Sequence, residues 1–308
     1  MSPIACRQCG NTDGPFTRDG ICENCEDGQP GWIDGLSADD YHADRTTISS
    51  SGLRALLPPG CPAQYAYDRD NPPAPKREFD LGHAVHTEVL GEGPELVALD
   101  YSTYLSRNAK EERDAAREAG QIPLLRHEWE QVQAMAEAVR KHPQAGPLLA
   151  PGMGIAERSI YWTDPATGVR CRCRPDWLMI RPDVTAIVDL KTTTDASPDA
   201  CSKAIESYSY HQAAALYVDG VQAAGFAHEG ARTFFVFQSK KAPYLVTVRE
   251  LKDQDQDIGR ARNERALRIY ADCTARNEWP DWTGPTDTIP QIGMPSWATL
   301  RQTEEYLK

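Results

Sequence analysis

The chain has 308 residues, a formal net charge of -12 and a hydrophobic content of 40%. This length suits one main core with a small satellite module, and the composition excludes a disordered or fibrous protein. The apolar runs are too short to span a bilayer and no secretory signal opens the chain, so we expect a cytoplasmic protein without a membrane partner. The acidic charge argues against phosphate binding over the whole surface, but it leaves a locally basic cleft open.

Four of the nine cysteines form two CxxC pairs near the N-terminus, Cys6 with Cys9 and Cys22 with Cys25, separated by twelve residues. Residues 1–30 have almost no apolar periodicity and cannot build a core of their own. Four thiolates can hold one Zn²⁺, and metal binding supplies the folding energy that such a segment lacks. The spacing therefore predicts a zinc ribbon over 1–30, with a redox dithiol as the alternative, followed by a linker over 31–47 and one domain over 48–308.

The rest of the chain alternates helical and strand patterns. A helix is expected to start near Ser49, and residues 126–142 show the three- and four-residue apolar spacing of an amphipathic helix. Strands over 155–163, 169–180 and 185–191, separated by turn signals, predict an antiparallel meander. A helix over 198–224, two further strands and a helix over 254–277 complete an α/β fold with a mixed central sheet flanked by helices.

The third strand of this meander ends in an unusual run of charge. Side chains alternate along a strand, so Asp189 and Lys191 share one face while Leu190 points to the other. Asp176, on the preceding strand, can then approach them. Two carboxylates suit Mg²⁺, which polarises a phosphodiester, and a lysine can orient water and offset developing charge. A DxK triplet alone is more often an ion pair on a solvated strand than an active site, so the context has to decide.

Two further segments supply that context. Gly82 to His86 opens a helix in which His86 is either a metal ligand or a capping or core histidine. Residues 208–217, after the DxK strand, contain Gln212 and Tyr217 and would alone be read as an ordinary helix surface.

Together these segments resemble the RecE branch of the PD-(D/E)xK nucleases, the phage and prophage exonuclease VIII family, which is related to RecB-type nuclease domains. The resemblance runs from about Asp40 to Trp297 and rests on several motifs in the right order. They are Asp40-Tyr41-His42, Ile48 to Leu53, Cys61-Pro62-Ala63, Gly82 to His86, Glu157, Arg174 to Trp177, Asp189 to Lys191, and His211-Gln212 with Leu216-Tyr217. It implies a restriction-endonuclease-like core.

The resemblance also implies roles for individual residues. His86, Asp176 and Asp189 are expected to bind Mg²⁺, with help from the Leu190 carbonyl, and Mn²⁺ is expected to substitute. Lys191 is expected to be the catalytic lysine. The remaining motif residues, Gln212 and Tyr217, would border the site. Glu157 stands where many relatives carry an acidic residue, although a glutamate at a strand edge is usually only solvated.

The activity implied is a 5′ to 3′ exonuclease acting on double-stranded DNA with free ends, which generates single strands for phage recombination. The implied partners are a single-strand annealing protein and further copies of the chain in a ring-like homo-oligomer, in the host cytoplasm if the gene is carried by a phage. Two alternatives stay open: a structure-specific or restriction-like endonuclease, which would cut closed circular DNA, and a non-catalytic DNA-binding or adaptor protein. The zinc ribbon is not explained by the resemblance.

Overall fold

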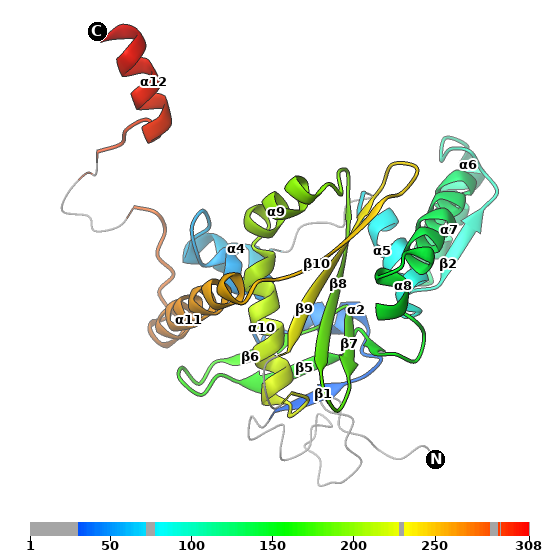
Figure 1. Cartoon of the computed structure of the whole chain (residues 1–308), viewed down its shortest axis with the longest axis horizontal. Coiled ribbons are helices and arrows are strands. Elements are labelled where there is room, and N and C mark those ends of the chain that lie inside the picture. The colour runs from blue at the N-terminus through cyan, green and yellow to red at the C-terminus, as the bar shows by residue number, and fades with distance from the viewer. Residues whose placement is uncertain (1–29, 72–77, 228–230, 284–288, 290, 308) are drawn as a thin grey trace.

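The structure is a computed structural model that describes residues 30–71, 78–227, 231–283, 289 and 291–307 (Figure 1). The predicted zinc ligands Cys6, Cys9, Cys22 and Cys25 lie outside these residues. Within the described part of the chain, no helix is long and apolar enough to cross a membrane. The free cysteines described, Cys61, Cys171, Cys173, Cys201 and Cys273, are all buried.

A five-stranded sheet forms the centre of the molecule, with strand order β10-β9-β8-β7-β4. Only β8 and β9 run parallel in this sheet, so it is mixed, as the sequence predicted. Helices cover both of its faces (Figure 1), which confirms the α/β fold class. The strands are β4 (Ile155–Ala156), β7 (Trp177–Ile180), β8 (Thr185–Thr193), β9 (Arg232–Ser239) and β10 (Val246–Glu250).

The alternation of side chains along β8 separates two apolar cores. Val188 and Leu190 pack with α5 (Glu78–Leu90) and α7 (Arg126–Lys141) in one core. Ile187 points the other way and packs with α10 (Tyr210–Ala223). Asp189 and Lys191 lie in register with Phe235 and Phe237 of β9. The DxK motif therefore lies near the middle of the sheet, on the face opposite Leu190, as the alternation predicted.

The predicted three-stranded meander is wrong. Residues 155–163 form two strands, β4 and β5 (Ser159–Thr163), and residues 169–180 form β6 (Arg170–Cys173) and β7. A second sheet with order β1-β5-β6 takes up β5 and β6, whereas β4 and β7 pair in the central sheet. The chain thus leaves the central sheet at Glu157–Arg158 and returns to it at Arg174–Asp176. The apolar pattern does not reveal this change of sheet, because a strand pattern with a period of two does not specify which strands pair with one another.

Residues 31–47, for which a linker was expected, contain β1 (Gly31–Ile33) and α2 (Ala38–Ala43). β1 pairs with β5. Arg172 donates hydrogen bonds from Nη1 to the carbonyl oxygens of Asp44 (2.9 Å) and Thr47 (2.8 Å). This segment is therefore bound to the second sheet along its length.

Helices complete the two sides of the sheet. On one side lie α5, α6 (Arg107–Glu118), α7 and α8 (Ala145–Leu148), with a parallel pair of strands, β2 (Leu96–Leu99) and β3 (Ile122–Leu125). The other side carries α3 (Ser50–Ala55), α4 (Pro62–Asp70), α9 (Pro198–Ser207), α10 and α11 (Asp253–Arg276). The helix α12 (Ser296–Tyr306) stands apart from the body in Figure 1.

The predicted helix over 198–224 is interrupted at Tyr208 and Ser209, and Ser209 has a left-handed φ of 53°. Its second half, α10, packs closely on α11. A Cβ at Gly259 would lie 2.2 Å from the carbonyl oxygen of His211, so only glycine permits this approach. Helix α10 is thereby held between α11 and the DxK face of β8.

Candidate metal centre

In the charged pair on β8, Asp189 is buried and Lys191 is half-buried. Asp189 is 2% exposed, and the Lys191 ammonium forms an ion pair with its Oδ1. Removing charge from water is costly, so a pair of this kind in the middle of a sheet indicates a function rather than a solvated edge. The ring of Tyr210 on α10 lies under the ammonium, with 5.2 Å between Nζ and the ring centroid. This aromatic neighbour of Lys191 was not identified from the sequence.

Asp176 comes from the segment in which the chain re-enters the central sheet. Its Oδ2 accepts a hydrogen bond from the backbone N–H of Leu190 at 2.8 Å. The carboxylate is therefore fixed to the backbone of β8 between Asp189 and Lys191, although its own residue lies outside any strand.

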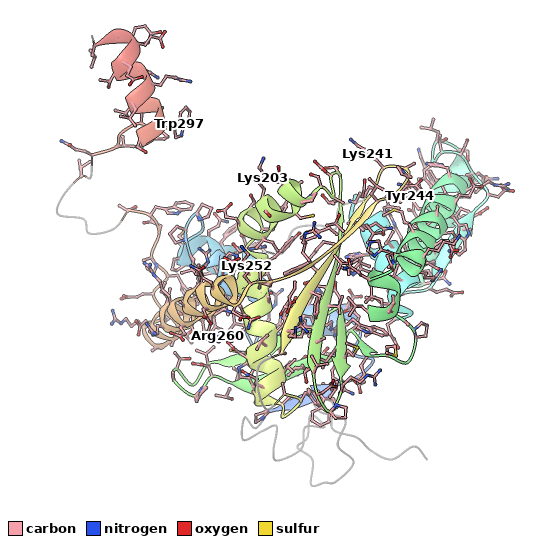
Figure 2. All side chains as sticks on the ribbon, in the orientation of Figure 1. Lys203, Lys241, Tyr244, Lys252, Arg260 and Trp297 are labelled. Atoms are coloured by element: carbon pink, nitrogen blue, oxygen red, sulfur yellow. The ribbon has the colours of Figure 1, made fainter. Side chains whose placement is uncertain are left out.

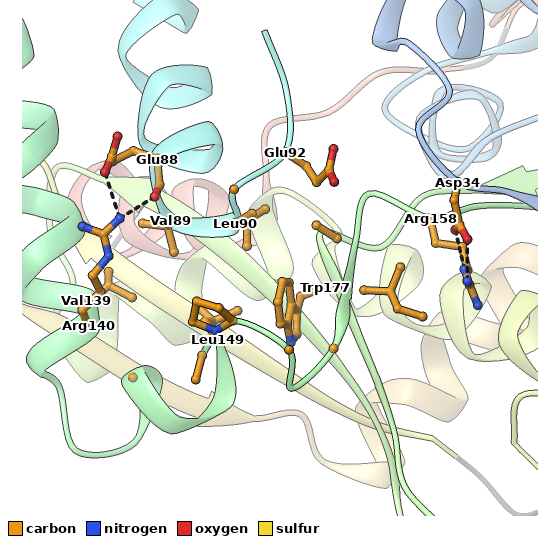
Figure 3. A pocket seen from close by; sticks show the side chains of 18 of the residues that line it. Asp34, Glu88, Val89, Leu90, Glu92, Val139, Arg140, Leu149, Arg158 and Trp177 are labelled. Atoms are coloured by element: carbon orange, nitrogen blue, oxygen red, sulfur yellow. Dashed lines mark hydrogen bonds and ion pairs between the residues drawn. The ribbon is translucent and has the colours of Figure 1, made fainter. Parts of the chain in front are cut away.

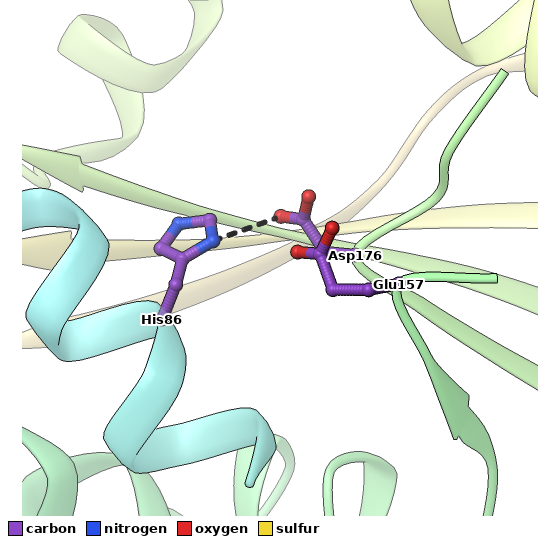
Figure 4. A group of neighbouring side chains, drawn as sticks. All are labelled: His86, Glu157 and Asp176. Atoms are coloured by element: carbon purple, nitrogen blue, oxygen red, sulfur yellow. Dashed lines mark ion pairs between the residues drawn. The ribbon is translucent and has the colours of Figure 1, made fainter. Parts of the chain in front are cut away.

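Glu157 lies where the chain leaves the central sheet. Its φ is 50°, in the left-handed region that residues with a Cβ rarely adopt, and its N–H donates to the carbonyl oxygen of Asp176 at 3.1 Å. Such backbone strain of roughly 1 to 3 kcal/mol concentrates at functional sites. The bend turns the Glu157 carboxylate toward Asp176 instead of leaving it on a strand edge (Figure 4).

His86 approaches from α5, on the other side of the cluster. Its Nδ1 lies 3.7 Å from Oδ2 of Asp176, and its ring is within hydrogen-bonding range of the Leu190 backbone. One ligand atom each from His86, Glu157 and Asp176 lie within 4.8 Å of one another (Figure 4). The exposed His83, one turn earlier, is not a member of this group. A nitrogen and two carboxylate oxygens are a suitable donor set for a divalent cation.

The charges of the cluster perturb one another. Burial, and then the Asp176 carboxylate, raise the pKa of Glu157 to about 8. The same two causes raise the pKa of Asp189 to about 7. Burial and the Lys191 ammonium lower the pKa of His86 to about 4, so its imidazole is neutral at pH 7 and free to act as a ligand. In a cation site without its ion, the grouped carboxylates lack a neutralising positive charge and are therefore hard to ionise. The raised pKa values of Glu157 and Asp189 fit such a site.

The surroundings of Lys191 favour its charged form. Burial alone would lower its pKa, but the carboxylates of Asp189 and Asp176 raise it above the normal value of a lysine. The side chain is therefore a permanent ammonium at neutral pH.

Arg174 connects the cluster to the N-terminal segment. Its Nε donates to Oγ of Ser159 at 2.9 Å and lies 4.0 Å from Oε2 of Glu157. Its guanidinium also stacks on the ring of Tyr41, 4.2 Å from the centroid. Arg174 was part of a family motif, but no role was predicted for it. Its position directly before Pro175 and Asp176 is the signal that could have identified it.

The two motif residues on α10 differ in their placement. Gln212 is turned toward α11, where its Oε1 accepts a hydrogen bond from Nε of Arg262 at 3.1 Å, so its side chain does not join the cluster. Tyr217 is half-buried, and its pKa is raised well above normal by burial and then by the Asp189 and Asp176 carboxylates. The carboxylates of Asp189 and Asp176 thus act electrostatically on Tyr217, whereas Gln212 helps to hold α10 in place.

A cavity of about 810 Å³ adjoins the cluster through Ala156 and Trp177, the sequence neighbours of Glu157 and Asp176 (Figure 3). The residues that line it do not include His86, Glu157, Asp176, Asp189 or Lys191. Two ion pairs cross its wall, Arg140 with Glu88 at 2.8 Å and Arg158 with Asp34 at 2.6 Å. The candidate metal-binding side chains therefore lie beside this cavity rather than within it.

Comparison with known proteins agrees with this architecture. Residues 49–291 match the family described as a PDDEXK-like domain of unknown function. A crystal structure of a "Putative exonuclease" from Eubacterium rectale is similar with a TM-score of 0.55 and 13% identity, over 86% of this chain and 97% of that one.

A phage related exonuclease from Haemophilus somnus 129PT gives a TM-score of 0.31 and 9% identity, over 75% and 96% of the two chains. No curated protein matches. The first likeness establishes the fold, and the second is too distant to add to it. Since the family match spans most of the sequence, the chain belongs to the PDDEXK-like domain family and, with it, to the PD-(D/E)xK nuclease superfamily.

Proposed function

We propose that this chain is a divalent-metal-dependent DNA nuclease whose site is formed by His86, Glu157, Asp176, Asp189 and Lys191. The observation that carries the proposal is the convergence of three ligand atoms within 4.8 Å beside the ion pair of the buried Asp189 with the half-buried Lys191. Segments far apart in the sequence supply these groups, so the convergence is a property of the fold and not of one local motif.

The donor set fits Mg²⁺ or Mn²⁺, with oxygen from Glu157 and Asp176 and nitrogen from His86. A cation held there would polarise the scissile phosphodiester and lower the pKa of the attacking water. The carboxylate of Asp189 forms an ion pair with Lys191, so we propose that Asp189 binds the cation less directly than the family resemblance implied. We retain the Leu190 carbonyl as a further ligand because the His86 ring already lies next to that backbone.

Lys191 would act on the phosphate and the water. Its ammonium, kept protonated by Asp189 and Asp176, can hold an attacking water by hydrogen bonding and stabilise the negative charge that develops on the phosphate oxygens. Asp189 fixes the position of that ammonium through the ion pair, and the Tyr210 ring supports it from the other side. The neutral imidazole of His86 would keep its ligand nitrogen free over the whole neutral range.

The substrate we propose is linear double-stranded DNA, degraded from 5′ to 3′ to leave single strands for phage recombination. The family resemblance supports this choice over an endonuclease. Lysines also gather where β8 ends: the pKa of Asp195, lowered mainly by hydrogen bonds from Ser197, is lowered further by Lys241 and Lys203. Figure 2 shows Lys203 on α9 and Lys241 on the β9–β10 turn at the same end of the molecule. These lysines could contact the DNA backbone despite the acidic net charge.

The remaining expectations are proposals of the same kind. We propose a ring-like homo-oligomer in the host cytoplasm, a single-strand annealing protein as partner, and one structural Zn²⁺ held by Cys6, Cys9, Cys22 and Cys25. Elemental analysis should find about one zinc per chain by the four-thiolate rule, and deletion of residues 1–30 should remove it while metal-dependent cleavage persists.

One experiment tests the central proposal. Purified protein is incubated with Mg²⁺ and linear, nicked or closed circular DNA labelled at either end. We expect nucleotides to be released from the 5′ ends of linear DNA while closed circles stay intact. Cleaved circles would identify an endonuclease instead, and binding without cleavage of any substrate would identify a non-catalytic DNA-binding protein.

A further inference from the structure

We propose that Tyr208 is a stacking platform for an unpaired nucleobase of the substrate strand, next to the catalytic lysine. This inference deepens the proposed nuclease function and rests on it. It also requires the substrate to be single-stranded next to the site, because only an unpaired base can stack on a side chain.

A ladder of aromatic rings leads from the core to Tyr208. Phe235 of β9 stacks on Tyr210 with 5.8 Å between centroids and 24° between planes, and Tyr210 stacks on Tyr208 at 5.4 Å and 24°. Phe235 is buried, Tyr210 is half-buried and Tyr208 is 58% exposed. One face of the Tyr208 ring is thus used by the ladder, and the exposure of the ring leaves the other face to solvent.

The same ladder touches the site. Tyr210, the middle ring, carries the Lys191 ammonium 5.2 Å from its centroid. Tyr208 is therefore one ring away from the group that we assign to the scissile phosphate. A base stacked on Tyr208 would belong to a nucleotide close to that phosphate in the same strand.

The backbone holds the platform in an unfavourable conformation. Ser209, between the two tyrosines, has a left-handed φ of 53°, and this bend ends α9 and starts α10. Arg54 of α3 donates from Nη1 to the Tyr208 carbonyl oxygen at 2.8 Å. An exposed tyrosine on an ordinary helix surface needs neither the strain nor the tie, whereas a preorganised binding surface benefits from both.

Stacking explains the type of residue. Every nucleobase has a π-face, so an aromatic platform accepts any base and suits an enzyme that must move along DNA of any sequence. Polar contacts to base edges would instead impose a sequence preference.

The test measures cleavage and binding for three variants. Relative to the wild type, Tyr208→Ala should raise KM for linear DNA about 5- to 100-fold, the range of one lost base stack, with little change in kcat. Tyr208→Phe should behave as the wild type, because the ring and not the hydroxyl stacks. The control is Tyr67→Ala, which removes a tyrosine of similar exposure, 63%, on α4.

Binding is measured separately with an oligonucleotide that carries 2-aminopurine in an unpaired end, with Ca²⁺ replacing Mg²⁺. We expect its fluorescence to be quenched by the wild type, Tyr208→Phe and Tyr67→Ala, but not by Tyr208→Ala. Equal KM and equal quenching for Tyr208→Ala and the wild type would overturn the platform and leave the nuclease proposal standing. A wild type that cleaves no DNA would overturn the nuclease proposal, and the quenching would still decide on stacking.

Discussion

The two halves of the site are built on different kinds of backbone. Asp189 and Lys191 stand on β8, a regular strand in the middle of the central sheet, whereas Glu157 and Asp176 stand on the two bends where the chain leaves that sheet and returns. The hydrogen bond from Glu157 N–H to Asp176 C=O ties these bends together. Regular structure fixes the position of Lys191, and irregular structure brings the carboxylates of Glu157 and Asp176 together at the candidate metal site.

This comparison assigns different work to the two halves. The strand half would act on the reacting phosphate, so substitutions there should mainly lower kcat. The bend half, together with His86, would hold the metal, so substitutions there should mainly raise the metal concentration needed for half-maximal activity. Variants on each half therefore test whether the two roles are separate.

The largest effect is expected on the strand half. Lys191→Ala should lower kcat by roughly 10²- to 10³-fold or more, because the ammonium stabilises charge that develops only in the transition state. The concentration of Mg²⁺ for half-maximal activity should change little. Initial rates over a Mg²⁺ titration measure both quantities, and a circular dichroism spectrum checks that the variant is folded.

Asp189→Asn is the companion variant, since it removes the partner of the ammonium while keeping the shape of the side chain. It should lose activity to a similar degree. A near-wild-type rate in either variant would show that the buried pair is structural and that the strand half takes no part in the chemistry.

A smaller effect is expected at His86. Loss of a ligand typically costs about 10- to 100-fold in metal affinity or activity, so His86→Ala should raise the half-maximal Mg²⁺ concentration by a factor in that range. Mn²⁺ should rescue the variant in part, because two carboxylates remain. His83→Ala is the matched control on the same helix and should follow the wild-type titration. Identical curves for both variants would remove His86 from the site.

The two halves also differed in how well they could be predicted. Asp189, Leu190 and Lys191 follow from strand alternation, which needs only the sequence, and β8 has the predicted arrangement. Glu157 was a candidate only through the family resemblance, and the bend that turns its carboxylate toward Asp176 was not predicted, because a period of two cannot show that a strand bends through a left-handed residue. The change of sheet is a tertiary effect that local apolar patterns do not encode.

The helix after β8 shows the same limit. Its apolar pattern was read correctly, but the break at Ser209 was not, and the break is what aligns Tyr208 and Tyr210 with Lys191. The motif residue Gln212 was expected to border the site, but it faces Arg262 instead. The motif was enough to predict the helix. The direction of the Gln212 side chain depends on packing against α11, which the motif does not contain.

The smallest expected effect is one of stability, and it isolates Glu157. Its folded pKa of about 8 lies above the ordinary value of 4.5, so the folded metal-free protein binds a proton that the unfolded chain releases. The folded state should accordingly gain stability as the pH falls from about 8.5 toward 7.5, a range that lies above the ordinary histidine pKa of 6.5, so that His86 stays largely neutral in both states. Asp189, with a pKa of about 7, adds to the gain in the lower part of this range.

Glu157→Gln removes one of these titrations and the repulsion with Asp176. We expect the metal-free variant to be more stable than the wild type at pH 8.5, on the order of 1 kcal/mol after solvent screening, and to show a weaker pH dependence. A divalent cation should reverse the order, since it stabilises the wild type by mass action and binds the variant less well. Urea unfolding at several pH values, with and without Mg²⁺, measures the difference in stability, its pH dependence and the response to the cation. If the wild type and Glu157→Gln respond equally to Mg²⁺, the bend at Glu157 serves the fold alone, and the cation is held without it.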